Sequence, residues 1–505
     1  MKELAHKYHA GQKRKGEGNI PYIVHPEAVV DTLLEWGVKP DSPMISIAWG
    51  HDLLEDTKVT EAEILNVSDE TVLAGIKMLT RPREADKKLY LEGIADSGNR
   101  DVLLVKVSDR ICNSKDFIKL EGKLSAYRYL HEADCLYQSL KKISNDQVAQ
   151  NALTAWESLD NELRESARRD AIRGCLIGGA AGDALGSPLE FLRKDSIEKI
   201  YGKNVSEYVE FSDGTGSITD DTQMTLFTVE GLLRANVRSR EKGICDPVSV
   251  MRFAYLRWLK TQGIEPEAPE DFINSGWLIQ EKQLFQQRAP GNTCITSLES
   301  KSVPARNNSK GCGTVMRMAP VGLFFEPEQA YDYGCKFSAL THGHPTGITS
   351  GGAFAMLIAY LMQGKTLSES LDLTARHLKK IPAASETLAA IRCARTASDI
   401  SEIGEGWIAE EALAIGIYCA VHHKWNFKAG VIEAVNIDGD SDSTGAIAGN
   451  ILGVMLGENC IPEGWRKNLQ EYEIVSRTAD DLYRIFECNE SGHVTEDWWE
   501  KYPGF

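Results

Sequence analysis

The sequence predicts an all-α protein, and two observations support this fold class. Apolar residues recur at helical spacing after residues that start helices, as in the run 224–233 that follows Thr219. Residues 1–145 show no convincing alternation of apolar and polar residues of the kind that marks strands. The length of 505 residues allows two to four domains of about 150 residues each. We expect two helical domains.

The first two predicted helices begin at prolines. One begins at His25-Pro26 and stops at Gly37, and the next begins at Ser42-Pro43. The second helix is expected to carry four polar residues on one surface, because they lie in pairs four positions apart: His51, Asp52, Glu55 and Asp56. Three carboxylates on one helical surface repel one another, so this crowding favours a bound cation.

A third helix, predicted over 102–113, places Asp109 and Asn113 one turn apart in an apolar run. A single buried Asp is more often structural than a metal ligand. Here, however, two imidazoles and two carboxylates could combine into a mixed set of nitrogen and oxygen ligands: His25, His51, Asp52 and Asp109. Such a set suits Mn²⁺, Fe²⁺, Co²⁺ or Zn²⁺.

These motifs resemble the RelA/SpoT type of HD-domain metal phosphohydrolase. The matching stretches are Arg14-Lys15, 21–26, 51–57 and 109–113. The resemblance implies an HD-type helical bundle over residues 1–145, with one Mn²⁺ or another divalent transition metal bound by His25, His51, Asp52 and Asp109. It implies that Glu55 and Asp56 activate water, and that Arg14, Lys15 and Asn113 contact the nucleotide. The expected substrate is guanosine tetra- or pentaphosphate or a related nucleotide, losing its 3′-pyrophosphate. No synthetase region follows. The alternative is a nucleotide-sensing regulatory module.

Residues 146–168 are polar and helix-prone, so a helical linker is expected there. A second domain is expected over 169–490, with a C-terminal tail at 491–505. Its first helix is unusually rich in small residues between 174 and 187. Because Gly disfavours helices, we expect this helix to pack closely against a neighbour.

Two acidic clusters lie in this second part. The stretch 436–445 alternates Asp438, Asp440 and Asp442 with small residues and continues with Ser443. Oxygen ligands of this kind suit Mg²⁺, Mn²⁺ or Ca²⁺, although an Asp-rich turn has the same composition. The other cluster consists of Thr219, Asp220 and Asp221, which lie in the first turn of a predicted helix. One oxygen satisfies a helix cap, so the second Asp is surplus unless a metal is bound.

Two weaker signals lie between the clusters. The Gly-rich stretch 310–320 could direct backbone N–H groups at a phosphate. His342 and His344 could suggest a transition metal, but their spacing before Pro345 favours a loop or a helix start.

Six stretches between about 168 and 460, taken in chain order, resemble the ADP-ribosylglycohydrolase family: 182–190, 219–222, 311–320, 342–345, 406–413 and 438–443. The resemblance implies an all-α fold that binds two Mg²⁺ or Mn²⁺ ions through Glu190, Thr219, Asp220, Asp221, Asp440, Asp442 and Ser443. Glu190, Asp220 or Asp221 would accept the proton of the attacking water, and Gly311, Gly313 and Arg317 would face the diphosphate or adenosine. The expected substrate is an ADP-ribosylated protein or small molecule. The alternative is a non-catalytic ADP-ribose binder. The chain departs from the family at Ser443, where Thr is common, and at Asp438, where Gly is usual.

The composition limits the classes of partner that the protein is expected to bind. The formal charge of −17 argues against a broad nucleic-acid or anionic-membrane surface. The N-terminus lacks an apolar signal segment, and the longest apolar run, 353–362, is shorter than the roughly 20 residues of a membrane span. Eleven cysteines without a CxxC pair favour free thiols and a cytoplasmic location. Together, the two halves predict a bifunctional hydrolase.

Overall fold

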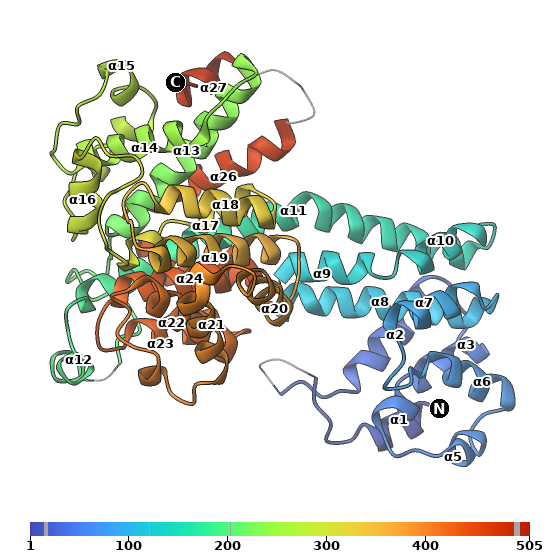
Figure 1. Cartoon of the computed structure of the whole chain (residues 1–505). Coiled ribbons are helices and arrows are strands. Elements are labelled where there is room, and N and C mark those ends of the chain that lie inside the picture. Colours follow the sequence, from blue (N-terminus) through green and yellow to red (C-terminus); the bar gives the residue numbers. More distant parts are fainter. Residues whose placement is uncertain (15–18, 121, 203, 489–494, 505) are drawn as a thin grey trace. The chain divides into compact units, whose positions relative to one another are not determined.

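The computed structural model describes residues 1–14, 19–120, 122–202, 204–488 and 495–504 (Figure 1). Among these residues there are helices and isolated β-bridges but no β-strand, which confirms the all-α fold class. The chain divides into two compact units, Met1–Ala167 and Arg168–Phe505. The boundary falls within α11 (Gln147–Gly186), so the expected linker region is helical.

The first unit is a bundle of short helices around α8 (Arg100–Leu120), which contacts α2, α3 and α6. Its core contains Val29, Ile47 and Leu104, which are all buried. The other helices are α1 (Lys2–Tyr8), α2 (Val24–Glu35), α3 (Pro43–Gly50), α4 (Leu53–Asp56), α5 (Glu61–Leu65), α6 (Glu70–Leu79), α7 (Lys87–Asp96), α9 (Gly122–His131) and α10 (Asp134–Lys142).

The predicted helix through His51 and Asp56 is interrupted. Ser42 caps α3 by accepting the Met44 N–H at 3.3 Å, as its Ser-Pro start predicts. However, α3 ends at Gly50 and α4 begins at Leu53. The expectation of one continuous helical surface was therefore wrong. The turn lets the imidazole of His51 hydrogen-bond the Ala48 carbonyl oxygen at 2.7 Å while it faces His25.

The second unit contains α11 from Arg168 onward and all later helices. They are α12 (Lys194–Tyr201), α13 (Asp220–Lys242), α14 (Pro247–Thr261), α15 (Glu270–Ile273), α16 (Asn292–Glu299), α17 (Ala319–Phe324), α18 (Pro327–Ser338), α19 (Pro345–Met362), α20 (Leu367–Leu378), α21 (Ser385–Thr396), α22 (Ala409–His422), α23 (Phe427–Val435), α24 (Ser441–Leu456), α25 (Glu463–Asn468), α26 (Tyr472–Cys488) and α27 (Glu496–Lys501). Short 3₁₀ turns include η1 (Ser187–Leu189) and η4 (Cys312–Thr314).

Helix α19 lies at the centre of the second unit, where it contacts α17, α18, α22 and α24 (Figure 1). His344 caps it and Pro345 is its first residue, so the His342–Pro345 stretch starts a helix. By length and composition α19 could cross a membrane, but 89% of it is buried inside the protein. A core helix satisfies the same criteria.

The small residues of α11 let it lie against α24 at backbone contact. A Cβ atom added at Gly182 would lie 2.1 Å from the Gly445 carbonyl oxygen. One added at Gly178 would lie 2.6 Å from that of Gly449. The close packing expected from the Gly-rich sequence is therefore present, and it places the start of α24 beside the end of α11.

The predicted C-terminal tail falls partly outside the described residues, at 491–494 and 505. Its described part forms α27 and reaches Tyr502, which is fully buried. The Tyr502 hydroxyl donates to Asp481 at 2.6 Å and accepts the indole N–H of Trp277 at 2.8 Å. This part of the chain is thus integrated into the second unit.

Candidate metal centres

In the first unit, the four predicted ligands lie close together. The Nε2 atom of His25 lies 3.0 Å from Asp109 Oδ1, and His51 Nε2 lies 3.3 Å from His25 Nε2 and 3.1 Å from Asp52 Oδ2. Candidate ligand atoms of His25, His51 and Asp52 lie within 4.8 Å of one another. Such separations suit one cation bound at about 2.1 Å by two imidazoles and two carboxylates.

Hydrogen bonds orient these ligands. The Nδ1 atom of His51 lies 2.7 Å from the Ala48 carbonyl oxygen, which directs Nε2 inward. Asn113 donates to Asp109 Oδ1 at 2.6 Å, and Lys106 pairs with Asp109 Oδ2 at 2.9 Å. The Nδ1 atom of His25 is buried without a hydrogen-bond partner. The ring of His25 is therefore held chiefly through its Nε2 atom.

The electrostatics of this centre favour positive charge. Burial lowers the pKa of His51, but Asp52 and Asp109 outweigh burial and raise it to about 9. Burial raises the pKa of Asp109, yet Lys106, His25 and His51 hold it well below its ordinary value. The carboxylates are thus ionised at neutral pH, as metal ligands must be.

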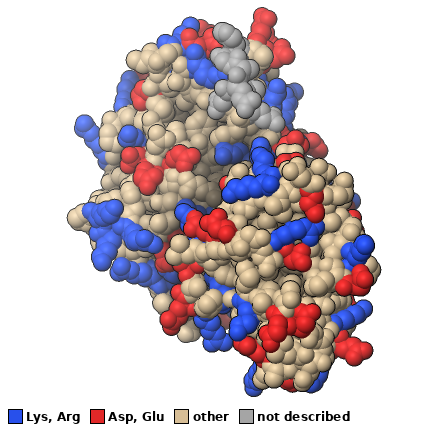
Figure 2. Space-filling view, turned by 90° about the vertical axis from the view of Figure 1, so that its right-hand side faces the viewer, with Lys and Arg blue, Asp and Glu red and all other residues tan. Residues whose placement is uncertain are grey.

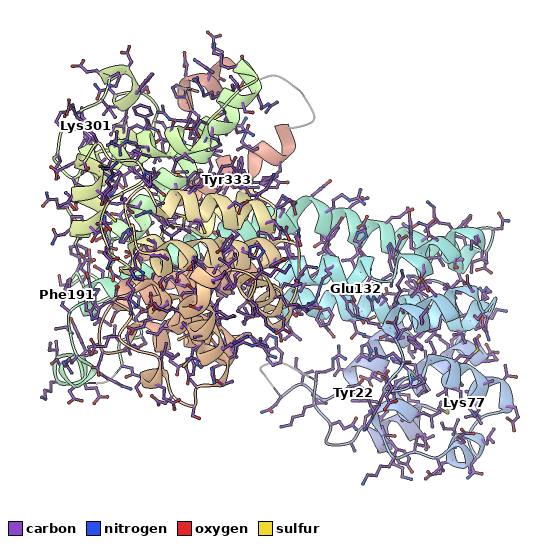
Figure 3. All side chains as sticks on the ribbon, viewed as in Figure 1. Tyr22, Lys77, Glu132, Phe191, Lys301 and Tyr333 are labelled. Atoms are coloured by element: carbon purple, nitrogen blue, oxygen red, sulfur yellow. The ribbon has the colours of Figure 1, made fainter. Side chains whose placement is uncertain are left out.

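The residues expected to act on water lie beside this set. The Tyr22 hydroxyl lies 2.8 Å from Asp52 Oδ2 and 2.7 Å from Asp56 Oδ2, so it bridges a predicted ligand and a predicted catalytic acid (Figure 3). Glu55 is exposed and accepts the Arg81 backbone N–H at 2.9 Å. The structure therefore brings Asp56 to the metal ligands through Tyr22.

The predicted nucleotide contacts are brought together in part. The guanidinium of Arg14 donates to Asn113 Oδ1 at 2.9 Å, and it also pairs with Asp116. Lys15, the third predicted contact, lies outside the described residues. Asn113 thereby links Arg14 to Asp109, which it also contacts.

In the second unit, two helix N-termini carry the acidic clusters. Thr219 caps α13, whose first turn holds Asp220 and Asp221, and Asp440 caps α24. Helices α13 and α24 are in contact, and Asp442 is the strongest charged neighbour of both Asp220 and Asp221. Folding thus unites acids that are more than two hundred positions apart in the sequence.

These acids are buried, and no Lys or Arg pairs with them in the described part of the chain. Asp220, Asp221, Asp440 and Asp442 are each at most 4% exposed. Asp220 Oδ2 accepts a hydrogen bond from the backbone N–H of Gly291 at 3.2 Å. Asp221 Oδ2 has no hydrogen-bond partner. Because an unpaired buried carboxylate is costly, this arrangement requires either protons or a cation.

Burial and the repulsion between these carboxylates shift their pKa values. Burial, followed by the charge of Asp442, raises the pKa values of Asp220, Asp221 and Asp440 well above the ordinary value. Burial, Asp442 and Asp440 raise the pKa of Glu190 to about 10. Glu190 therefore belongs electrostatically to the same cluster.

The donor set fits hard cations. No three His, Cys, Asp or Glu ligand atoms in the described part of this unit lie within 4.8 Å of one another. Carboxylates alone therefore do not form a single-ion cage, and the buried hydroxyls of Thr219 and Ser443 would have to contribute. Oxygen donors from both helix starts suit Mg²⁺ or Mn²⁺.

Asp183 was not among the predicted site residues, although it supports the site. It is fully buried and accepts the N–H groups of Thr219 at 3.0 Å and Thr222 at 3.1 Å. Burial and Asp442 raise its pKa to about 7. The sequence did contain one signal for this role: Asp183 is a charged residue within a helix of small residues that is expected to pack closely, and a buried charge there indicates specific polar partners. Its contacts fix the start of α13.

The predicted diphosphate contacts separate into two groups. Gly311 and Gly313 flank Cys312, and burial followed by the charges of Asp440 and Asp221 raises the pKa of its thiol well above the ordinary value, so this loop borders the acids. Arg317, by contrast, is fully buried and hydrogen-bonds the Thr341 hydroxyl. The structure therefore argues against the expected contact between Arg317 and a diphosphate. A buried guanidinium of this kind organises the interior instead.

Comparison with known proteins agrees with this geometry. The model of the family described as ADP-ribosylglycohydrolase matches residues 164–492, which contain both acidic clusters. The chain belongs to the ADP-ribosylglycohydrolase family.

Curated relatives match most of their own length. The ADP-ribosylarginine hydrolase Tri1 of Serratia proteamaculans is 25% identical over 323 residues, covering 64% of this chain and 81% of the relative. The ADP-ribosyl-[dinitrogen reductase] glycohydrolase of Rhodospirillum rubrum is 24% identical, covering 59% of this chain and 90% of the relative. A solved structure described as a metazoan ortholog of SpoT that hydrolyzes ppGpp covers 32% of this chain and 91% of its own, at 19% identity. Its TM-score of 0.27 is too low to establish a shared fold.

The chain departs from the expected family pattern at two positions, Ser443 and Asp438. Ser443 keeps a hydroxyl at the buried start of α24. The exposed Asp438 turns to α12, where its Oδ1 accepts the Lys194 backbone N–H at 2.7 Å. The extra carboxylate therefore has a hydrogen-bond partner in a neighbouring segment.

Proposed function

We propose that the second unit hydrolyses the glycosidic bond of ADP-ribosylated substrates with two Mg²⁺ or Mn²⁺ ions. The observation that carries this proposal is the group of buried carboxylates at the starts of α13 and α24, which have no Lys or Arg partner in the described part of the chain. Family membership and the named activities of the relatives agree with it.

Seven residues would hold the ions: Glu190, Thr219, Asp220, Asp221, Asp440, Asp442 and Ser443. When bound, the ions would orient the ribose diol and lower the pKa of water. Glu190 is the proposed proton acceptor once bound cations lower its pKa, because it is half-buried whereas Asp220 and Asp221 are buried. The backbone of the Gly311–Gly313 loop would face the diphosphate, and Asp183 would keep Thr219 in place.

Release of ADP-ribose tests this proposal. The full chain with Mg²⁺ or Mn²⁺ is incubated with peptides ADP-ribosylated on arginine or on serine, and with an ADP-ribosylated nucleic-acid base. The arginine conjugate is tested first, because one relative is named an ADP-ribosylarginine hydrolase. We expect metal-dependent release that EDTA stops. Tight binding of ADP-ribose without any release would identify a non-catalytic binder instead.

We further propose that the first unit hydrolyses a phosphorylated nucleotide, with guanosine tetra- or pentaphosphate as the first substrate to test. The supporting observation is that ligand atoms of His25, His51 and Asp52 lie within 4.8 Å of one another and that Asp109 Oδ1 lies 3.0 Å from His25 Nε2. These four residues would hold one Mn²⁺ or a similar ion, which would activate water and neutralise phosphate charge when bound. Asp56, hydrogen-bonded to Tyr22, would accept the proton, and Glu55 would help to position the water.

The test uses the full chain with Mn²⁺ and measures pyrophosphate released from guanosine tetraphosphate. Wild type should turn over, and Asp56→Ala should not. If wild type binds the nucleotide without releasing pyrophosphate, the first unit is a sensor rather than an enzyme.

A further inference from the structure

The residues that follow Glu190 and the start of α12 are hydrogen-bonded to the loop that carries the acids of α24. Asp438 Oδ1 accepts the N–H of Lys194, the first residue of α12, at 2.7 Å. Beyond α12, Asn436 Oδ1 accepts the Val205 N–H at 2.7 Å, and Asn436 Nδ2 donates to the Val205 carbonyl oxygen at 2.9 Å. Asp438 thus holds the start of α12, and Asn436 of the same loop holds Val205, four residues after the end of α12.

The residue after Glu190 shows that this turn is held under constraint. Phe191 has φ = 67°, in the left-handed region that costs a bulky residue about 1–2 kcal/mol. Phe191, which is labelled in Figure 3, is 70% exposed. Its ring stacks on that of Trp407 with centroids 5.3 Å apart and planes at 21°. The Trp407 carbonyl oxygen in turn accepts the Cys312 N–H at 3.2 Å. Strain of this kind persists only where surrounding contacts enforce it.

The remaining backbone hydrogen bonds of this turn are local. Glu190 N–H donates to the Gly186 carbonyl oxygen, and Leu192 N–H donates to that of Leu189. Before Glu190, the close approach of Gly186 to Ser441 sets the distance between the turn and α24, because a Cβ atom added at Gly186 would lie 2.2 Å from the Ser441 carbonyl oxygen. After Glu190, the bond from Lys194 to Asp438 ties the turn to the loop two residues before Asp440.

We propose that Asp438 is a positioning residue for the glycohydrolase reaction: by capping α12 it holds Glu190 in line with the acids of α24. This inference rests on the proposed function of the second unit and extends it. Asp438 acts through an accepted hydrogen bond, not through its charge. An Asn side chain can supply the same acceptor, whereas Ala and the Gly usual in the family cannot.

The test measures ADP-ribose release by the full chain. Asp438→Ala should lower kcat about 10-fold with KM within about twofold, since small misplacements of a catalytic group cost one to two orders of magnitude. Asp438→Asn should stay within about threefold of wild type. In a Glu190→Gln background, Asp438→Ala should have no further effect, because residues that act through one another are not additive. Asp195→Ala, an exposed acid in the same first turn of α12, is the control and should match wild type.

Three results would overturn the inference. Equal losses in Asp438→Asn and Asp438→Ala, with weakened Mn²⁺ affinity, would show that the charge acts on the ions. Equal losses in Asp438→Ala and Asp195→Ala would show a general effect on α12. Wild-type activity in Asp438→Ala would show that the bond is dispensable. Absence of release by wild type would instead refute the proposed function itself, and this inference with it.

Discussion

At the scale of single residues, the second site is defined by acids whose burial only a cation or protons can compensate. Asp221 illustrates this, because its Oδ2 is buried without a partner. Asp221→Asn should lower ADP-ribose release by on the order of 100-fold or more, since it removes a ligand. The same change should leave the Tm in EDTA equal or higher, because a buried charge is removed.

The control for Asp221→Asn is Asp271→Asn, which alters an exposed acid of the same unit. It should change neither release nor Tm. Loss of activity in Asp221→Asn together with a lowered Tm in EDTA would indicate unfolding rather than loss of a ligand.

His342 offers a test of pH dependence. Burial, and then the charge of Arg317, lower its pKa to about 3. Its contribution to stability is therefore present above the unfolded pKa of 6.5 and is lost as the pH falls toward 3. Between pH 7.5 and pH 5 this amounts to about 2 kcal/mol. His342→Asn should reduce the difference in the free energy of unfolding, measured with urea, between these two pH values. If the free energy of unfolding changed with pH equally in wild type and in His342→Asn, this prediction would be contradicted.

At the scale of secondary-structure elements, contact between α11 and α24 positions the start of α24. Gly182→Ala should lower the Tm and ADP-ribose release together, because its Cβ would lie 2.1 Å from the Gly445 carbonyl oxygen. Gly464→Ala in α25 is the matched control: nothing lies within 4 Å of its added Cβ, and Ala favours helix by up to about 1 kcal/mol. An unchanged Tm in Gly182→Ala would contradict the close packing.

Local signals predicted many of these elements, while tertiary contacts decided the rest. The cap at Thr219, the Ser42-Pro43 start and the glycine-rich face of α11 follow from short-range rules. The break between α3 and α4 and the burial of Arg317 do not, because they depend on partners distant in sequence. The role of Asp183 was missed for the same reason.

At the scale of the whole molecule, each unit has its own core and its own candidate centre. The face shown in Figure 2 mixes Lys and Arg with Asp and Glu rather than presenting one broad basic surface. Asp109→Ala should abolish nucleotide hydrolysis and leave ADP-ribose release within about twofold of wild type. Asp442→Asn should abolish ADP-ribose release and leave nucleotide hydrolysis within about twofold of wild type. Assays of both activities on each full-length variant check this. Loss of both activities in either variant would show that the centres are coupled.

Binding of two divalent cations between the starts of α13 and α24 can be observed by anomalous X-ray diffraction from crystals of the full chain grown with Mn²⁺. We expect two manganese peaks bordered by Asp221 on one side and by Asp440 and Asp442 on the other. A map with no manganese at these carboxylates, in crystals whose protein is active, would contradict this expectation.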